Sequence, residues 1–186
     1  MAEQPTSSIT RFSVSTLRSK VSDFAKGHRY NVIIKPPANA GLSIGITENL
    51  KFLCESVSLP TKSIASNAHD IYGPPREMPY RTTFTEAAMS FILDDEMNVK
   101  SYFDKWQSFI INDDTGNPRY WNDYVGSIQI HRLKNNAITE ADDAYKVELE
   151  EAYPSVVGEI ALSHSGGNEI LRLPVTFKYR KWTIIN

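Results

Sequence analysis

The stretch Leu171-Arg172-Leu173-Pro174-Val175-Thr176-Phe177-Lys178-Tyr179 decides the fold class. Large apolar side chains occupy every second position, which is typical of a β-strand with one face buried in a core. Pro174 lies on the opposite face and has no amide hydrogen, so it predicts an edge position or a bulge. We expect this strand to run from Glu169 to Tyr179 in an antiparallel sheet.

Two segments upstream show the same alternation and predict a hairpin. Ile128 and Ile130 alternate with polar residues, and Tyr145, Val147 and Leu149 do the same. Each strand should therefore have one dry face and one solvated face, as in an antiparallel sheet. The polar segment 133–143 should form the tip. The solvated faces would carry Gln129, His131, Lys146, Glu148 and Glu150.

Four further segments favour extended structure because they are rich in β-branched and aromatic residues or are bounded by proline. They are Tyr30–Ile34, Leu50–Val57, Arg81–Thr85 and Ala87–Leu93. The last is apolar on both faces, which predicts a central strand. Residues 38–49 contain two glycines and are predicted to form a loop.

One helix is expected from Met97 to Ile111. Val99, Phe103, Trp106 and Ile110 recur at helical spacing and form one apolar face. The chain is therefore expected to be mainly β, an antiparallel sandwich or barrel of about seven strands with one packed α-helix.

Residues 1–28 differ in composition from the β domain expected at 29–186. They are rich in Ser and Thr, and four apolar residues at helical spacing would form one narrow stripe: Val14, Leu17, Val21 and Phe24. This segment is either a frayed terminus or an arm that becomes ordered against a neighbouring subunit.

A second candidate contact region is the proline-containing connector from Thr61 to Tyr80, predicted to be a long loop. Loops longer than about 12–15 residues are uncommon in compact domains and tend to be functional. This one holds four large apolar side chains, which either pack within the monomer or contact another subunit: Ile64, Ile71, Tyr72 and Met78.

The composition excludes several classes. The 186 residues carry 20 Lys+Arg against 22 Asp+Glu, a net charge of -2, which argues against a dedicated nucleic-acid binder. The single cysteine, Cys54, cannot form an internal disulfide. No apolar run is long enough to cross a bilayer, and the N-terminus does not resemble a secretory signal. We therefore expect assembly in a reducing cytoplasm.

No catalytic, cofactor or metal site emerges from the sequence. Gly41 and Gly45 are not followed by the Lys-Ser/Thr of a phosphate-binding loop, and the four histidines lack metal-ligand spacing. Glu148 and Glu150 share one strand face, but alternation with apolar residues explains them as a solvated face. The strand setting of Cys54 favours a buried structural thiol over a nucleophile.

Several segments, in order along residues 20–182, resemble one family. They include Asp23-Phe24-Ala25 before Tyr30-Asn31-Val32-Ile33, Phe52 to Pro60, Phe103-Asp104-Lys105-Trp106-Gln107, and Tyr153-Pro154-Ser155-Val156-Val157-Gly158-Glu159-Ile160. In these features the chain is similar to the tail tube proteins of contractile-tailed (myovirus-type) bacteriophages.

The resemblance implies a structural subunit that has no cofactor and is not an enzyme. Six-membered rings would join their sheets into one inner β-barrel and stack into a tube. The implied partners are the tail sheath, the tape-measure protein, and baseplate and tail-terminator proteins. DNA would pass transiently and non-specifically, with no membrane insertion, in a virion assembled in the host cytoplasm.

A channel through which DNA passes should not bind it tightly. Basic linings would do so, because they bind phosphate strongly. We therefore expect an acidic or neutral channel wall, lined or bordered by Gln129, His131, Lys146, Glu148 and Glu150. The alternative is that these strand faces point outward to the sheath. One alternative is a baseplate tube initiator or a secretion-system tube paralogue. Another is a carbohydrate- or peptide-binding β-sandwich that uses Tyr120, Trp121 and Tyr124. A hydrolase that uses Glu148 and Glu150 is the remotest.

Overall fold

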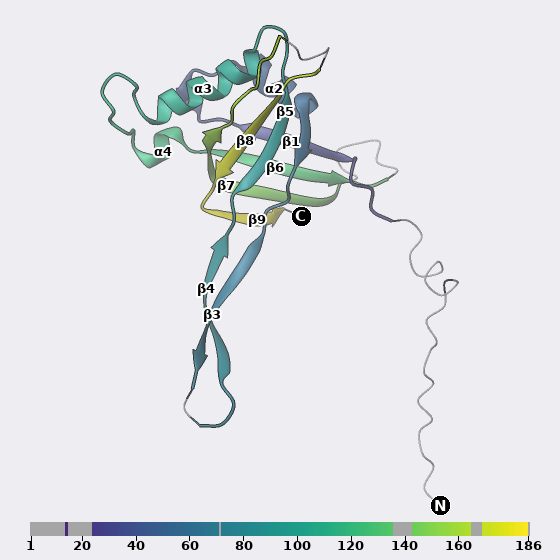
Figure 1. The fold of residues 1–186 in the computed structure, drawn as a ribbon, viewed down its shortest axis with the longest axis vertical. Helices are drawn as coiled ribbons and strands as arrows, with labels where there is room; N and C mark the ends of the chain where they lie inside the picture. The colour runs from purple at the N-terminus through teal and green to yellow at the C-terminus, as the bar shows by residue number, and fades with distance from the viewer. Residues whose placement is uncertain (1–13, 15–23, 71, 136–142, 165–168, 186) are drawn as a thin grey trace, which may run out of the picture.

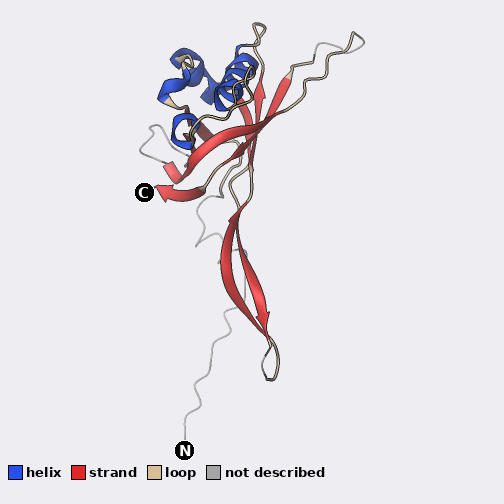
Figure 2. Ribbon diagram, turned by 90° about the vertical axis from the view of Figure 1, so that its left-hand side faces the viewer, coloured by secondary structure: helices blue, strands red, loops and turns tan. Residues whose placement is uncertain are grey.

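The computed structural model describes residues 14, 24–70, 72–135, 143–164 and 169–185. Seven strands form one sheet, and β3 and β4 form a separate two-stranded ribbon that projects from the body (Figure 1, Figure 2). Every strand pair is antiparallel, so the predicted mainly β class is confirmed. Helices lie at one end of the body (Figure 2).

Half of the sheet, here called sheet A, has the order β1-β6-β7-β9. Its strands are β1 (Tyr30–Lys35), β6 (Gly126–Leu133), β7 (Asp143–Val157) and β9 (Lys181–Ile185). The β6–β7 register pairs Ile128 with Leu149 and Ile130 with Val147, and all four side chains are buried. The predicted hairpin is therefore confirmed, although most of its tip lies outside the described residues. The short strand β9 was not predicted.

The other half, sheet B, has the order β7-β8-β5-β2. Its additional strands are β8 (Arg172–Lys178), β5 (Ala87–Ile92) and β2 (Cys54–Val57). Leu173, Val175 and Phe177 of β8 are fully buried, as the opening alternation predicted. β5 is an interior strand as expected. Its predicted burial on both faces is wrong, because Ala88 on the second face is exposed.

Pro174 predicted an edge position or a bulge. The edge position is wrong, because β8 lies between β7 and β5, and the register shift of the β7–β8 pair lies between Pro154 and Val156 rather than at Pro174. The carbonyl of Pro174 accepts a hydrogen bond from the Gly158 amide at 2.8 Å, so this side of Pro174 faces Gly158. Gly158 lies one residue beyond the end of β7. Pro174 therefore lacks an amide hydrogen on the side where the hydrogen-bonded pairing with β7 has already ended, and an interior strand tolerates this.

β7 belongs to both halves of the sheet. Residues 143–152 pair with β6 and residues 146–150 with β9, whereas residues 153–157 pair with β8. Glu151 lies at a register shift in the β6 pairing, between Leu149 and Ala152, with φ 55°, a left-handed conformation that is uncommon for residues other than glycine. The strand passes from sheet A to sheet B just beyond this residue, between Ala152 and Tyr153.

The predicted helix is confirmed as α3 (Asn98–Ile110), with Val99, Phe103 and Trp106 buried. Residues 38–49 are not a loop, because they contain the 3₁₀ helix η1 (Ala38–Ala40) and the start of α2 (Ile44–Leu53). α2 takes the first half of the strand predicted at Leu50–Val57. Ile46, Leu50 and Leu53 repeat at helical spacing and pack on the core, so helical burial outweighs strand propensity. A single turn, α4 (Trp121–Tyr124), precedes β6.

The loop predicted at residues 61–80 is also wrong. β3 (Lys62–His69) and β4 (Arg76–Phe84) pair along this segment and continue through the predicted extended residues 81–84. Their register shifts between Ala65 and Ser66, which face Arg81 and Pro79. Pro79 therefore sits beside a bulge on a two-stranded ribbon, where a missing amide donor is tolerated.

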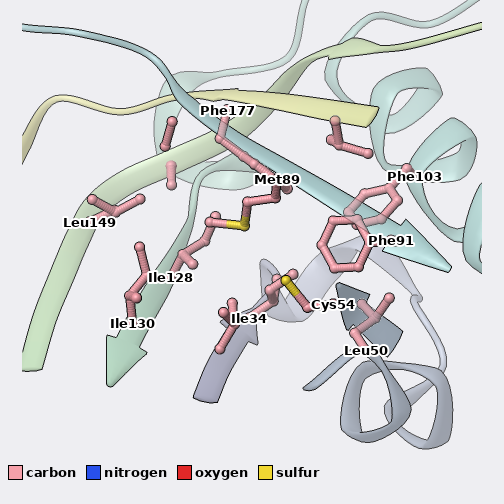
Figure 3. Close-up of a cluster of buried hydrophobic side chains, with 14 of the residues drawn as sticks. Ile34, Leu50, Cys54, Met89, Phe91, Phe103, Ile128, Ile130, Leu149 and Phe177 are labelled. Atoms are coloured by element: carbon pink, nitrogen blue, oxygen red, sulfur yellow. The ribbon is translucent and has the colours of Figure 1, made fainter. Parts of the chain in front are cut away.

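The core lies between the two halves of the sheet and is closed by α3 (Figure 3). The Phe103 ring centroid lies 5.1 Å from that of Phe91 and 5.8 Å from that of Phe177. Trp106 donates a hydrogen bond to the Tyr124 carbonyl at 3.0 Å. A Cβ atom on Gly126 would lie 2.3 Å from the Lys35 carbonyl oxygen and 3.1 Å from the Trp106 ring.

Gly126→Ala tests this packing. The added methyl group would push β6 away from β1 and Trp106, so we expect the free energy of unfolding to fall by about 1–3 kcal/mol. Chemical denaturation followed by far-UV circular dichroism measures this change. Gly27→Ala is the control, because nothing lies within 4 Å of a Cβ atom there. Equal stability of the two variants would contradict the prediction.

Candidate assembly surfaces

The five residues predicted to face the channel lie together on the side of sheet A away from the core. The register pairs Gln129 with Glu148 and His131 with Lys146, and Glu150 follows on β7. The Gln129 side-chain amide donates to the Glu148 carboxylate at 3.3 Å. The face is less solvated than predicted, since His131 is buried and the other four are half-buried.

Neighbouring strands add charges to this surface, here called the polar face. Lys35 on β1 and Lys181 on β9 have the same parity as the predicted residues. Lys181 forms a 3.0 Å ion pair with Glu150, which also accepts a 3.2 Å hydrogen bond from Thr183. Three lysines therefore accompany two glutamates. The polar face is mixed in charge, whereas the hairpin strands alone predicted an acidic or neutral wall.

Sheet A has two open edges. Within the described residues, β1 pairs only with β6 and β9 only with β7. The inner side of β9 is also incompletely covered, because Ile184 remains 55% exposed. The buried indole nitrogen of Trp182 has no hydrogen-bond partner among the described residues. Unpaired strand edges invite pairing with another chain, so these edges are candidate subunit contacts.

The β3–β4 ribbon is a second candidate surface. It extends well beyond the body (Figure 2), and nearly all its side chains are exposed. The predicted contact residues Ile64 and Met78 lie on the ribbon and Tyr72 lies in its turn, all exposed to solvent. Tyr80, which was not predicted, joins them. Ile71 lies outside the described residues.

The predicted N-terminal arm is only partly described. Val14 and Phe24 are exposed, whereas Leu17 and Val21 lie outside the described residues. The Phe24 carbonyl accepts a 2.8 Å hydrogen bond from the Asn135 side-chain amide. The end of the arm is therefore placed beside the β6–β7 hairpin.

One side-chain contact connects the two halves of the sheet, and another joins two strands of sheet B. The Tyr30 hydroxyl on β1 donates to the carbonyls of Cys54, at 3.0 Å, and Glu55 on β2. The Arg172 guanidinium on β8 binds the Glu55 carboxylate with two bonds of 2.6 and 2.9 Å. These hydrogen bonds, with the charge of Arg172, lower the pKa of the Glu55 carboxyl.

A second carboxylate holds the bend of β7. Glu151 accepts hydrogen bonds from the Arg180 guanidinium and from the Trp121 indole, each of 2.7 Å. These bonds, Arg180 first, lower the pKa of the Glu151 carboxyl. The side chain thereby ties the strained residue to α4 and to the β8–β9 connection.

The described residues form no group of three or more potential metal ligands. Burial raises the pKa of the Cys54 thiol to about 12, so it remains protonated and unreactive near neutral pH. Glu148 and Glu150 are held by Gln129, Thr183 and Lys181 rather than by each other. No helix in the described part of the chain is long and apolar enough to span a membrane.

The aromatic residues considered for ligand binding pack against one another. Trp121, Tyr124 and Tyr153 form three edge-to-face contacts with centroid distances of 5.5 to 5.8 Å. Tyr120 remains largely exposed. The cluster supports the bend at Glu151, and nothing in it favours the carbohydrate- or peptide-binding alternative.

Solved structures define the class to which this fold belongs. The chain is similar to a protein from the anti-feeding prophage (AFP) baseplate, with TM-score 0.64, 12% identity, and coverage of 89% of this chain and 97% of that chain. It is similar to a protein of the extracellular contractile injection system PVC sheath/tube terminator, with TM-score 0.65, 17% identity, and 89% and 99% coverage. A protein of the PVC sheath-tube complex gives TM-score 0.59, 13% identity, and 94% and 98% coverage.

At these identities the similarity shows the fold alone, that of contractile injection tube and terminator assemblies. No curated protein matches the chain by sequence. The phage tail tube protein family, however, matches residues 25–185. The chain belongs to this family and is a structural subunit of a tail tube.

Acid titration tests the two carboxylate contacts. The pKa values of Glu55 and Glu151 are lower in the folded state than the ordinary carboxyl pKa, about 4.3. The two ionised carboxylates therefore stabilise the fold fully above that value. This contribution is lost as pH falls through the lowered pKa values. We expect Glu55→Gln/Glu151→Gln to have a lower melting temperature than the natural protein near neutral pH.

The difference should narrow as pH falls below about 4, because the natural carboxylates then become neutral as well. Thermal unfolding followed by circular dichroism across this range measures it. Glu159→Gln, at an exposed position, is the control. A difference that stays constant across the pH range would contradict the prediction.

Proposed function

We propose that six copies of this chain form a ring in which sheet A continues from subunit to subunit. The open edges of sheet A carry this proposal. Strand direction alternates through β1, β6, β7 and β9, so β1 and β9 run antiparallel. Copies related by rotation would therefore bring β9 of one subunit beside β1 of the next in an antiparallel pair. A closed ring leaves no open edge of sheet A.

The polar face would line the channel of this ring. The other face of sheet A is covered by the core, sheet B and α3, so only the polar face is available to a lumen. Gln129, His131, Lys146, Glu148 and Glu150 would then contact the channel interior, together with Lys35 and Lys181. Local pairing, such as that of Lys181 with Glu150, limits the number of lysines able to hold phosphates of passing DNA.

Stacking of rings would give a hollow tube for the tape-measure protein and later for DNA ejection. We assign the β3–β4 ribbon to contacts between subunits, because its exposed apolar residues have no partner surface within the body. A stable contact of this kind buries about 800 Å² per partner. The N-terminal arm, residues 1–28, would add its apolar stripe to these contacts and become ordered on assembly.

The remaining features of the proposal follow from a structural role. The chain would have no catalytic activity and would work in the virion tail after assembly in the host cytoplasm. Its partners would be sheath, baseplate and tail-terminator proteins. Fold similarity to proteins from sheath-tube, baseplate and terminator assemblies supports this set. A tube-initiator protein would form single rings, whereas a tube-body protein would elongate alone.

Chemical cross-linking tests the ring. Ile33→Cys on β1 and Thr183→Cys on β9 lie on the polar face in the middle of their strands. A short bis-maleimide should join the double variant into a ladder of covalent oligomers that ends at the hexamer, because each contact joins the β1 edge of one subunit to the β9 edge of the next. Native Cys54 is buried and does not compete. Each single-cysteine variant should give no ladder, and a ladder from either one would contradict the edge assignment.

Negative-stain microscopy tests the ribbon. Ile64→Asp/Met78→Asp places charges on the exposed ribbon, so we expect folded protein whose tubes are shortened or absent. Leu162→Asp, at an exposed apolar residue outside the ribbon, should form tubes of natural length. Unchanged tubes from the double variant would contradict the role of the ribbon. A monomeric natural protein would contradict the proposed function itself.

A further inference from the structure

A groove of about 610 Å³ lies along the solvent side of α3, between α3, Ala40 and Arg119. The buried side of the same helix carries Phe103 and Trp106, which pack into the core. The polar face of sheet A lies beyond that core. If the polar face lines the channel, the groove therefore opens on the side of the subunit away from the channel.

The acidic residues of the groove are already satisfied. Asp104 forms a 2.6 Å ion pair with Lys100, one helical turn away. The Glu96 carboxylate accepts a 2.9 Å hydrogen bond from the Asn98 side-chain amide. Both carboxylates are thus engaged by neighbours that line or adjoin the groove.

Two cations of the groove differ in this respect. Neither Lys105 nor Arg119 forms an ion pair within the described part of the chain. The Arg119 guanidinium lies 4.4 Å from the centroid of the Phe109 ring, and its backbone amide donates to the Ile110 carbonyl at 3.0 Å. The ring and the backbone hold the arginine in place, yet its guanidinium has no carboxylate partner.

The groove also offers apolar contact. Met97, Phe109 and Ala40 line it together with the two cations. A complementary ligand therefore carries carboxylates for Lys105 and Arg119 and an apolar side chain for Phe109. A short acidic protein segment meets both requirements, whereas a nucleic acid backbone would need a longer row of cations than two.

We propose that this groove binds an acidic segment of the sheath subunit, with carboxylates on Lys105 and Arg119 and an apolar residue against Phe109. This assignment rests on the proposed tube function, which turns α3 away from the channel and towards a surrounding sheath. The arginine contributes specificity, because its planar guanidinium binds a carboxylate with two parallel hydrogen bonds.

Sheath binding to preformed tubes tests the groove. The probe is the purified sheath subunit from the same tail, mixed with tubes of the natural chain and of Lys105→Glu/Arg119→Glu. Co-sedimentation should show at least a roughly tenfold loss of sheath affinity for the double variant, because two attractive contacts become repulsive. Tubes of this variant should still form, since both side chains lie on the solvent side of the subunit. Binding to natural tubes should weaken as salt is raised.

Two controls make the result specific. Lys105→Arg keeps both charges and the Arg119 guanidinium, and should bind sheath nearly as well as the natural chain. Lys51→Glu/Lys134→Glu makes the same change of net charge at exposed positions outside the groove and should also bind. Equal loss in this second control would overturn the proposal, as would natural affinity in Lys105→Glu/Arg119→Glu.

The outcomes also separate this inference from the proposed function. Tubes that form but bind sheath independently of Lys105 and Arg119 would refute the groove assignment and leave the tube function standing. Absence of tubes from the natural chain would refute the tube function. Loss of tubes in Lys105→Glu/Arg119→Glu would place the groove in a contact between tube subunits and overturn the sheath assignment.

Discussion

The structure depends on one strand, β7, that pairs in two sheets at once. Its first part is bonded to β6 and β9, and its last part to β8. The strand bends just before this change of sheet, at Glu151, whose positive φ is unfavourable for a side chain with a Cβ atom. Arg180 and Trp121 offset that cost by binding the Glu151 carboxylate from two other elements. The bend therefore joins sheet A to sheet B.

The bend also explains why one domain can present surfaces of different kinds. Sheet A turns its polar face outward and keeps both edges open, while sheet B and α3 enclose the core behind it. Polar and charged side chains thus lie on one side of the core, and the groove with Lys105 and Arg119 lies on the solvent side of α3. A subunit that separates a channel from an outer wall needs such a division.

Local pattern predicted much of this arrangement. The alternation at residues 171–179 and the hairpin around Ile130 and Val147 correctly gave strands, because one-sided burial imposes a two-residue period. The helix at α3 followed from its 3.6-residue period. The prolines of residues 61–80 predict a loop, but Pro74 and Pro75 lie in the turn between β3 and β4, and Pro79 lies beside a bulge that the sequence does not reveal. The short strand β9 was missed altogether, and with it Lys181 of the polar face.

The sequence by itself determined the antiparallel β class, the buried residues of the hairpin and the shared face of Gln129, Glu148 and Glu150. Periodicity alone is sufficient for these, because neighbouring residues decide which side chains can be buried together. Only the tertiary structure decided that β8 is an interior strand despite Pro174, that α2 replaces half of a strand, and that Lys35 and Lys181 join the polar face. Each of these depends on which segments distant in sequence lie side by side, and local spacing does not encode that.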